Sequence, residues 1–363
     1  MMRSRTRAPT RTTFRTRLRR AALLALPTLW GGGAVTWELT CPLAQQNSLG
    51  ARIVSSAVFF LVGSGLIFHV RQGLLRELRE VRAVAGAAQS VLLRPLPARL
   101  DGFALAAGQL SADRAASIGG DLYDVVSTDH GVRVVMGDVR GHGLGALAGV
   151  GAVLGSFREA AHDEAELAGV LRRLERAHGR HLRRHAGDEH PAAPDEKPDC
   201  ALAEEFVTVL LLEIRRDGTV YALNCGHPWP YLLRPGAVRC AEPLTGGEPM
   251  PPVGMFPLPA DLAPARCGRI APGEGLLLHT DGIEDARDAH GRFFPLQEEL
   301  RATVRRRRTI VPEAVIRAVY GRLLGHAGGP PGDDAALVVL CNERRRVPVQ
   351  HTEPAGRCAQ RVH

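Results

Sequence analysis

Four short apolar runs in this chain carry aspartate at one end, with glycine close by, although strands usually avoid both residues. The stretches are GGDLYD with Asp121, MGDVRG with Asp138, HTDGIEDA with Asp281, and GDDAALVVL with Asp333 and Asp334. A single Asp-Gly pair is most often only a turn. Four such stretches constrain the fold more strongly, because converging strand ends would gather carboxylates without a matching cluster of Lys or Arg.

A divalent cation resolves such a cluster of carboxylates. Magnesium and manganese prefer carboxylate, carbonyl and water oxygens as ligands. The neighbouring glycines permit tight turns and the close approach of backbone or ligand. Asp129 lies between the first two acids, in the turn STDHG, and we interpret it as ordinary turn chemistry. The pattern therefore predicts a metal site wherever the four ends meet.

The order of the expected elements is neither a strict strand–helix alternation nor a run of strands alone. A turn at His130-Gly131 joins two strands, and Arg216-Asp217-Gly218 joins another pair. This order favours antiparallel sheets with helices on their faces, an α+β architecture. We expect strands over 103–112, 121–127, 132–137, 206–214, 219–224, 230–234, 273–286 and 335–341, and helices over 144–163, 165–184 and 312–326.

Two uncharged apolar segments, 21–37 and 53–70, precede this region. Both are short but sufficient, because a spanning helix needs roughly 17 to 25 residues. Eight arginines and no acids in residues 1–20 favour a cytoplasmic N-terminus, and the arginines after the second segment place that flank inside as well. We expect two transmembrane helices over 21–72 with a short outside loop, in the cell membrane, and a cytoplasmic remainder. A cleavable signal peptide is the alternative for the first segment.

Residues 73–97 connect the second segment to the rest of the chain. Apolar residues recur there at heptad-like spacing until two prolines end the pattern. A dimeric connector and a helix packed on its own domain both remain open. Residues 98–343 are the expected soluble domain, in which 185–200 is polar, Pro-containing and typical of a flexible insertion. The basic tail 344–363 is expected to be disordered.

Composition and missing motifs exclude several functions. The seven cysteines are scattered and show no C-x-x-C spacing, which argues against a disulfide framework or a zinc site and favours a reducing compartment. The chain has no G-x-x-x-x-G-K-[ST] loop, no G-x-S-x-G elbow and no H-E-x-x-H motif. The net charge of +8 is concentrated in separate arginine runs, so it does not by itself indicate nucleic-acid binding.

From about residue 89 to 341 the chain closely resembles the SpoIIE-like bacterial branch of the metal-dependent PPM protein serine/threonine phosphatases. The matching stretches, in order, are AAQSVLLRPLP, SIGGDLYDV, VMGDVRGHGLGA, FVTVLLLEI, LNCGHPWPYLL, PPVGM, LLLHTDGIEDARDAHGRFF and GDDAALVVL. The resemblance implies a PPM-type α/β/β/α sandwich, two antiparallel sheets flanked by helices. It also implies two Mn²⁺ or Mg²⁺ ions between the sheets at one edge.

The resemblance also assigns the ligands of these ions. In such a site the two ions share a water, lower its pKa and clamp the phosphoryl oxygens for in-line attack. Asp121 and Asp138 match the acids nearest both metals, and Asp138 matches the bridging one. The full implied set is Asp121, Asp138, the backbone carbonyl of Val139, Asp281, and Asp333 with Asp334 as its less favoured neighbour.

Other residues near these acids have more than one interpretation. Arg140 stands where eukaryotic relatives have His, and it either pairs with phosphate or is simply exposed. His142 is a possible general acid for the leaving oxygen, with water on the metals as the alternative source of the proton. Gly120 is a possible substrate contact. His227, in NCGHPWP, resembles a family turn and is interpreted as structural, and His279 replaces a frequent Tyr and is interpreted as packing.

The resemblance implies a membrane-anchored, cytoplasm-facing phosphatase that hydrolyses phosphoserine or phosphothreonine. The usual substrates in this branch are phosphorylated anti-anti-sigma proteins with a STAS domain, so such a protein is the favoured partner, and a homodimer is a further possibility. One alternative is a regulatory protein of the same fold that binds partners without turnover, which the four retained acid positions disfavour. Another is a different two-metal enzyme such as a nuclease, which the lack of a basic groove near the acids disfavours.

Overall fold

The structure is a computed structural model of the chain, and it describes residues 30, 33, 36, 49–110, 119–141, 144–189 and 206–344. The chain divides into two compact units, Met1–Ala83 and Val84–His363. The boundary between them falls within one long helix, α2, which begins at Leu49 and ends at Leu92.

One helix among the described residues is long and apolar enough to cross a membrane. Its apolar window, Ala57–Arg76, has a mean hydropathy of 1.5 and is 6% buried. This window overlaps the expected segment 53–70. The expected first span, 21–37, lies outside the described residues apart from isolated positions such as Trp30, whose ring centroid lies 5.6 Å from that of Phe59. The expectation of two transmembrane helices is therefore not confirmed, and the one candidate rests on length and composition alone.

Helix α2 also contains most of the predicted connector 73–97. It runs without a break through Gly86 and ends at Leu92, shortly before Pro95. Proline disfavours helix in the residue before it and cannot continue the hydrogen-bond ladder, which explains the stop. The span and the connector are thus one continuous helix, and the dimeric role suggested for the connector stays a prediction.

The described residues of the second unit form two antiparallel sheets. The six-stranded sheet has the order β1-β2-β11-β10-β7-β8, and the five-stranded sheet has the order β3-β4-β5-β6-β9. The strands of the first sheet are β1 (Arg99–Leu100), β2 (Phe103–Leu110), β7 (Tyr231–Leu233), β8 (Ala241–Pro243), β10 (Gly275–His279) and β11 (Ala335–Asn342). Those of the second are β3 (Asp121–Thr128), β4 (Gly131–Val139), β5 (Val207–Ile214), β6 (Thr219–Cys225) and β9 (Ala265–Arg269).

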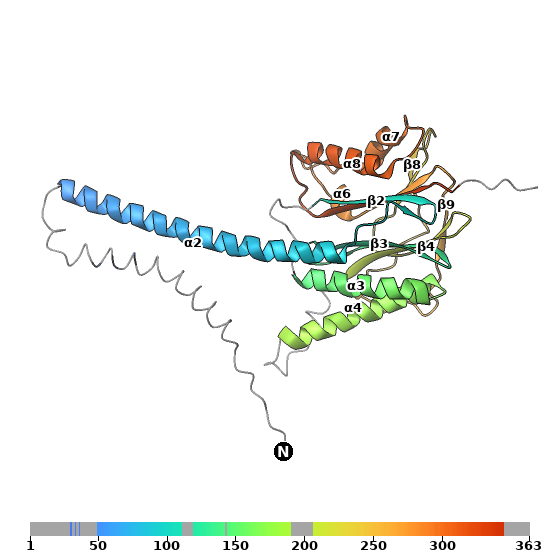
Figure 1. Cartoon of the computed structure of the whole chain (residues 1–363), viewed down its shortest axis with the longest axis horizontal. Helices are drawn as coiled ribbons and strands as arrows, with labels where there is room; N and C mark the ends of the chain where they lie inside the picture. Colours follow the sequence, from blue (N-terminus) through green and yellow to red (C-terminus); the bar gives the residue numbers. More distant parts are fainter. Residues whose placement is uncertain are drawn as a thin grey trace, which may run out of the picture. The chain divides into compact units, whose positions relative to one another are not determined.

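Helices cover the outer face of each sheet (Figure 1). On the five-stranded sheet lie α3 (Leu144–Asp163) and α4 (Leu167–Glu189). Around the six-stranded sheet lie α6 (Asp281–Glu284), α7 (Leu296–Val304) and α8 (Pro312–Ala327). The layers are therefore helix, sheet, sheet, helix, which is the α+β sandwich that the sequence predicts.

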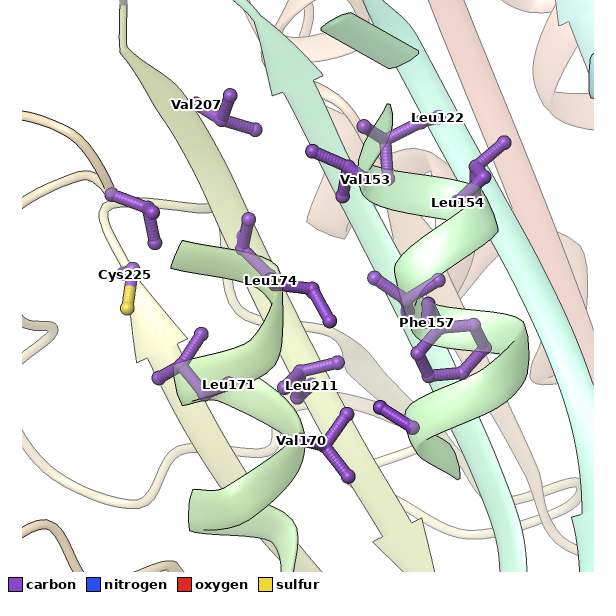
Figure 2. Close-up of a cluster of buried hydrophobic side chains, with 14 of the residues drawn as sticks. Leu122, Val153, Leu154, Phe157, Val170, Leu171, Leu174, Val207, Leu211 and Cys225 are labelled. Atoms are coloured by element: carbon purple, nitrogen blue, oxygen red, sulfur yellow. The ribbon is translucent and has the colours of Figure 1, made fainter. Parts of the chain in front are cut away.

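Three large hydrophobic clusters separate these layers in the described part of the chain. The first lies between the five-stranded sheet and helices α3 and α4, and it includes Phe157, Leu171 and Leu211 (Figure 2). The second lies between the six-stranded sheet and α7 and α8. The third lies between the two sheets. Strands in the middle of a four-layer sandwich are buried on both faces, which is why β11 is an unbroken apolar run, AALVVLCN, buried at every position.

The structure changes two of the expected boundaries. The expected strand 273–286 ends at His279, and the residues after Thr280 turn into the one-turn helix α6. The expected insertion 185–200 begins too early, because α4 continues to Glu189. The rest of that segment lies outside the described residues, as does the expected tail 344–363 apart from its first residue.

Candidate metal centre

The hairpin of β3 and β4 places two of the predicted acids side by side. Asp121 begins β3, and its direct partner in the antiparallel register is Asp138, near the end of β4. The turn at 129–130 between the strands fixes this pairing. Like charges directly opposite one another destabilise a sheet, so this pair is not explained by strand stability.

Strand alternation points Asp138 into the space between the two sheets. Successive side chains on a strand face opposite ways. Val134 and Met136, which share the face of Asp138, belong to the cluster between the sheets, whereas Val135 and Val139 pack against the helices. The carboxylate of Asp138 therefore faces the other sheet.

The six-stranded sheet brings its acids to the same place. Asp281 follows β10 and opens α6, and Asp333 and Asp334 directly precede β11. Because β10 and β11 are antiparallel neighbours, the end of one and the start of the other lie at the same edge. A hydrogen bond joins the two sheets there: the hydroxyl of Thr280 donates to Oδ2 of Asp121 at 3.1 Å.

Glycines leave room for the acids to approach closely. A Cβ on Gly120 would lie 2.0 Å from the carbonyl oxygen of Val139 and 2.5 Å from Oδ1 of Asp138. A Cβ on Gly119 would lie 1.9 Å from Oδ2 of Asp334. No side chain fits at such distances, so both glycines are required by the packing of the acids. The Val139 carbonyl thus faces the same small space as the carboxylates.

Burial and mutual repulsion raise the pKa values of these acids. Burial, followed by the charge of Asp138, raises the pKa of Asp121 well above its usual range, and the Thr280 hydroxyl opposes this. Burial, followed by the charges of Asp281, Asp333 and Asp334, raises the pKa of Asp138 to about 7. Burial and the charge of Asp333 also raise the pKa of Asp281.

Within the described residues, no arginine or lysine forms an ion pair with Asp121, Asp138 or Asp281. The carboxylates and the Val139 carbonyl are all hard oxygen donors, so the donor set fits Mg²⁺ or Mn²⁺. In the same part of the chain, however, no three acid, histidine or cysteine side chains already stand together as a closed metal cage. The case for a metal centre is therefore the uncompensated charge of the cluster.

The two adjacent acids before β11 both act on the cluster, but in different ways. Asp334 is buried, and its charge raises the pKa values of Asp121 and Asp138. Asp333 is exposed and accepts a hydrogen bond from the Asp334 N–H at 2.8 Å. Its charge raises the pKa values of Asp138 and Asp281. The preference for Asp333 as the ligand stays a prediction, and the burial of Asp334 makes it a closer competitor than the sequence pattern indicates.

The predicted substrate contacts are only partly described. Arg140 is exposed, and its guanidinium lies 5.1 Å from the ring centroid of Phe206. Its side chain is therefore held beside the end of β4. Gly120 lies against the acids, as described above. His142, the possible general acid, lies outside the described residues.

Several supporting residues were not singled out from the sequence. Thr280 is fully buried, and its hydroxyl accepts a hydrogen bond from the Ala336 N–H at 2.9 Å while donating to Asp121. Thr208 on β5 accepts a hydrogen bond from the Asp138 N–H at 3.1 Å. The only sequence signal for either is a threonine within or just after an apolar strand, in FVTV and LLLHT, and threonine is an ordinary strand residue.

Comparison with known families links this site to known proteins. Residues 128–343 match the family model of Stage II sporulation protein E (SpoIIE). The matched region contains Asp138, Asp281 and Asp333 and begins after Asp121. No curated protein sequence matches the chain.

Solved structures show a similar sandwich. The SiaA-PP2C domain of Pseudomonas aeruginosa aligns over 75% of this chain and 98% of its own, at 17% identity and a TM-score of 0.50. The RsbU and RsbW domains of Rv1364c from Mycobacterium tuberculosis align over 66% of this chain and 60% of theirs, at 20% identity and a TM-score of 0.46. The phosphatase domain with a regulatory fragment of SpoIIE from Bacillus subtilis aligns over 66% and 63%, at 13% identity and a TM-score of 0.47. The chain thus spans less than two thirds of the length of the Rv1364c and SpoIIE structures. The likeness to the SiaA domain shows a shared fold.

Proposed function

Because the chain belongs to the SpoIIE family and has the PPM phosphatase fold, we propose that it is a metal-dependent protein serine/threonine phosphatase. One observation carries the proposal. Acids from both sheets converge on one point and raise one another's pKa values, and no described Arg or Lys forms an ion pair with Asp121, Asp138 or Asp281. Perturbed titrating groups of this kind gather at functional sites more often than elsewhere.

The proposed ligands are the oxygen donors of this cluster. Divalent cations bound there supply Lewis acidity and an activated water for attack on phosphorus. Asp138, Asp121 and the Val139 carbonyl would hold the ions from the β3–β4 hairpin, with Asp138 as the shared ligand, and Asp281 and Asp333 would hold them from the other sheet. Arg140 at the rim pairs with the phosphate oxygens of the substrate. His142, or water, provides the proton for the leaving oxygen.

The substrate we propose is phosphoserine or phosphothreonine on a STAS-type anti-anti-sigma protein. The sequence resemblance supports this choice. Helix α2, whose apolar window is flanked by arginines, would anchor the protein in the membrane with the phosphatase unit on the cytoplasmic side. The predicted homodimer would form through the same helix.

The decisive experiment measures phosphate release by the full chain, purified in detergent, from a phosphoserine peptide. We expect release only with added Mn²⁺ or Mg²⁺, and none after chelation with EDTA. Asp138→Asn should lower the rate at least about 100-fold, since even residues behind metal ligands contribute about 10- to 100-fold. Asp163→Asn, at an exposed acid on α3, is the matched control and should leave the rate unchanged.

Three outcomes would overturn the proposal. Phosphate release that does not depend on metal would exclude the two-metal mechanism. Binding of a phosphorylated STAS protein without turnover would favour the regulatory alternative, in which the fold recognises a partner but does not hydrolyse it. Cleavage of DNA or RNA under the same conditions would favour a nuclease.

A further inference from the structure

The backbone at the end of β4 is held by a side chain from the neighbouring strand. Thr208 on β5 is the register partner of Asp138. Its hydroxyl oxygen accepts a hydrogen bond from the Asp138 N–H at 3.1 Å and lies 3.5 Å from the Asp138 carbonyl oxygen. The Thr208 hydroxyl therefore contacts the backbone of Asp138, and the orientation of this backbone fixes the direction of the Asp138 side chain.

Thr208 is itself held by a buried histidine. Nδ1 of His227, in the loop after β6, lies 3.1 Å from Oγ1 of Thr208. The imidazole is 3% exposed. Burial, followed by the neighbouring His279, lowers the pKa of His227 to about 3, while the backbone of His279 opposes the shift. At neutral pH the ring is therefore an uncharged hydrogen-bonding group next to a hydroxyl.

The structure of the loop does not explain why residue 227 is histidine. Asn224 clamps the turn on both sides: its Oδ1 accepts from the His227 N–H at 2.9 Å, and its Nδ2 donates to the His227 carbonyl at 2.8 Å. Both bonds use only the backbone of His227. The turn therefore does not require an imidazole at residue 227, and the ring is left for its contact with Thr208.

We propose that His227 is a positioning residue, which acts through Thr208 to hold Asp138 and the Val139 carbonyl in the geometry that binds the divalent cations. The inference rests on the proposed function. Two of the proposed ligands depend on this one peptide segment, because the Asp138 carboxylate and the Val139 carbonyl belong to consecutive residues. A small rotation of the Asp138 backbone would therefore displace both at once.

The site has a second threonine that serves as a comparison. Thr280 donates directly to the Asp121 carboxylate, with no histidine between them. Asp121 is thus held through its side chain, whereas Asp138 is held through its backbone. The backbone support leaves all four lone pairs of the Asp138 carboxylate available, which is what a ligand shared by two ions requires.

Paired variants at each position test the relay. Asn places an amide where Nδ1 of histidine stands, whereas Gln places one near Nε2, so His227→Asn keeps the bond to Thr208 and His227→Gln loses it. Thr208→Ser keeps the hydroxyl, and Thr208→Val removes it at nearly constant shape. Thr219→Val, at a buried threonine at the opposite end of the same sheet, is the matched control.

The main measurement is Mn²⁺ affinity of the full chain without substrate, by isothermal titration calorimetry, alongside thermal unfolding of the metal-free protein. We expect His227→Gln and Thr208→Val to weaken Mn²⁺ binding by about 10- to 100-fold, as removal of groups behind metal ligands does. His227→Asn and Thr208→Ser should stay close to wild type and well short of that loss, because each retains the contact. Thr219→Val should lower the unfolding temperature without changing Mn²⁺ affinity.

Equal Mn²⁺ affinities for His227→Asn and His227→Gln would overturn the inference, as would variants that lose only thermal stability. In both cases a wild type that binds Mn²⁺ and releases phosphate leaves the proposed function intact. A wild type that binds no Mn²⁺ overturns the proposed function itself, and the positioning role with it.

Discussion

Strand β4 carries an ionisable side chain near each end, Arg133 fully buried and Asp138 half-buried, and the two have opposite surroundings. Arg133, near its start, is fully buried, and its guanidinium donates to Oε2 of Glu213 at 2.8 Å. It also donates to three carbonyls at the end of α3 and in the following turn: Ala161 at 2.9 Å, Glu164 at 2.6 Å and Ala165 at 2.8 Å. Asp138, roughly 17 Å along the strand, has carboxylates for neighbours instead.

The difference separates a structural charge from a functional one. A buried charge persists in a fold only if something neutralises it. At Arg133 the protein provides every partner, so the group joins a strand to the end of a helix. At Asp138 the described residues provide no cationic partner, and the pKa of the carboxyl rises to about 7 instead. Removing the charge of Arg133 should therefore lower the stability of the metal-free protein, whereas removing the charge of Asp138 should raise it.

The largest expected effect is at the compensated end. Arg133→Met leaves Glu213, whose side chain is 8% exposed, without its main partner, and leaves three carbonyls without a donor. Removing one member of a buried pair lowers stability by about 3–5 kcal/mol. Urea denaturation of the metal-free protein measures this loss.

The control for this prediction is the double variant Arg133→Met with Glu213→Met. Replacing both partners with apolar groups should recover part of the lost stability, because no buried charge is then left alone. Mn²⁺ affinity should stay unchanged in both variants while they remain folded. A change in Mn²⁺ affinity would show that the two ends of β4 are not independent.

A smaller effect of opposite sign is expected at Asp138. Its folded pKa of about 7 lies above its ordinary value of 3.8, so the folded protein keeps this proton at pH values where the unfolded chain has lost it. Stability of the metal-free protein should therefore fall as pH rises from about 4 to about 7, and level off above that. Asp138→Asn removes this contribution and should be more stable than wild type at pH 7.5, by on the order of 3 kcal/mol.

The difference in stability between wild type and Asp138→Asn at each pH isolates the contribution of Asp138. Other titrating groups, such as Asp217, whose pKa is lowered by hydrogen bonds from Thr219, are the same in both proteins. Mn²⁺ at about 1,000 times its Kd should reverse the ranking at pH 7.5, because a ligand that binds only the folded state then stabilises it by about 4.1 kcal/mol. If Asp138→Asn is less stable than wild type without metal, the carboxylate has a protein partner and the contrast with Arg133 is wrong.

Much of the site was predictable because each acid lies in a local motif. Glycine beside aspartate at a strand end can be recognised in the sequence alone. The His130-Gly131 turn fixes the register that pairs Asp121 with Asp138. Antiparallel strands before and after the acids then bring the four ends together. The layered fold was likewise predictable, because its buried strands are continuous apolar runs.

The supports of the acids were not predictable in the same way. Thr280 meets Asp121 across 159 residues and between two sheets, and nothing in the local sequence of either specifies the other. His227 was correctly placed in a turn, but its contact with Thr208 depends on how β5 and β6 pair. The end of β10 was also misjudged, because the apolar and polar alternation of HTDGIEDA does not show where the chain begins to coil into α6.

The smallest expected effect comes from a second comparison, on strand β3. Asp124 lies three residues after Asp121 but on the opposite face of the sheet, toward α3. There it pairs with Arg158 at 2.6 Å, and the same arginine donates to the Leu92 carbonyl at the end of α2 at 2.7 Å. The structure thus places Asp124 in a partly buried ion pair on the face away from the cluster of acids.

Arg158→Gln should therefore lower stability by about 1–2 kcal/mol, less than Arg133→Met, because Asp124 and Arg158 keep some contact with water. The Leu92 carbonyl also loses a donor at a helix end, so amide exchange in the last turn of α2 should speed up more than exchange in β3. Hydrogen exchange followed by mass spectrometry, with urea denaturation, measures both. A matched Asp124→Asn variant should give a similar loss of stability without affecting the end of α2, since it leaves the bond to Leu92 in place. If Arg158→Gln instead weakens Mn²⁺ binding, the Asp124–Arg158 pair supports the metal centre. The distinction between a structural charge and a functional one, which is based on β4, would then not hold for β3.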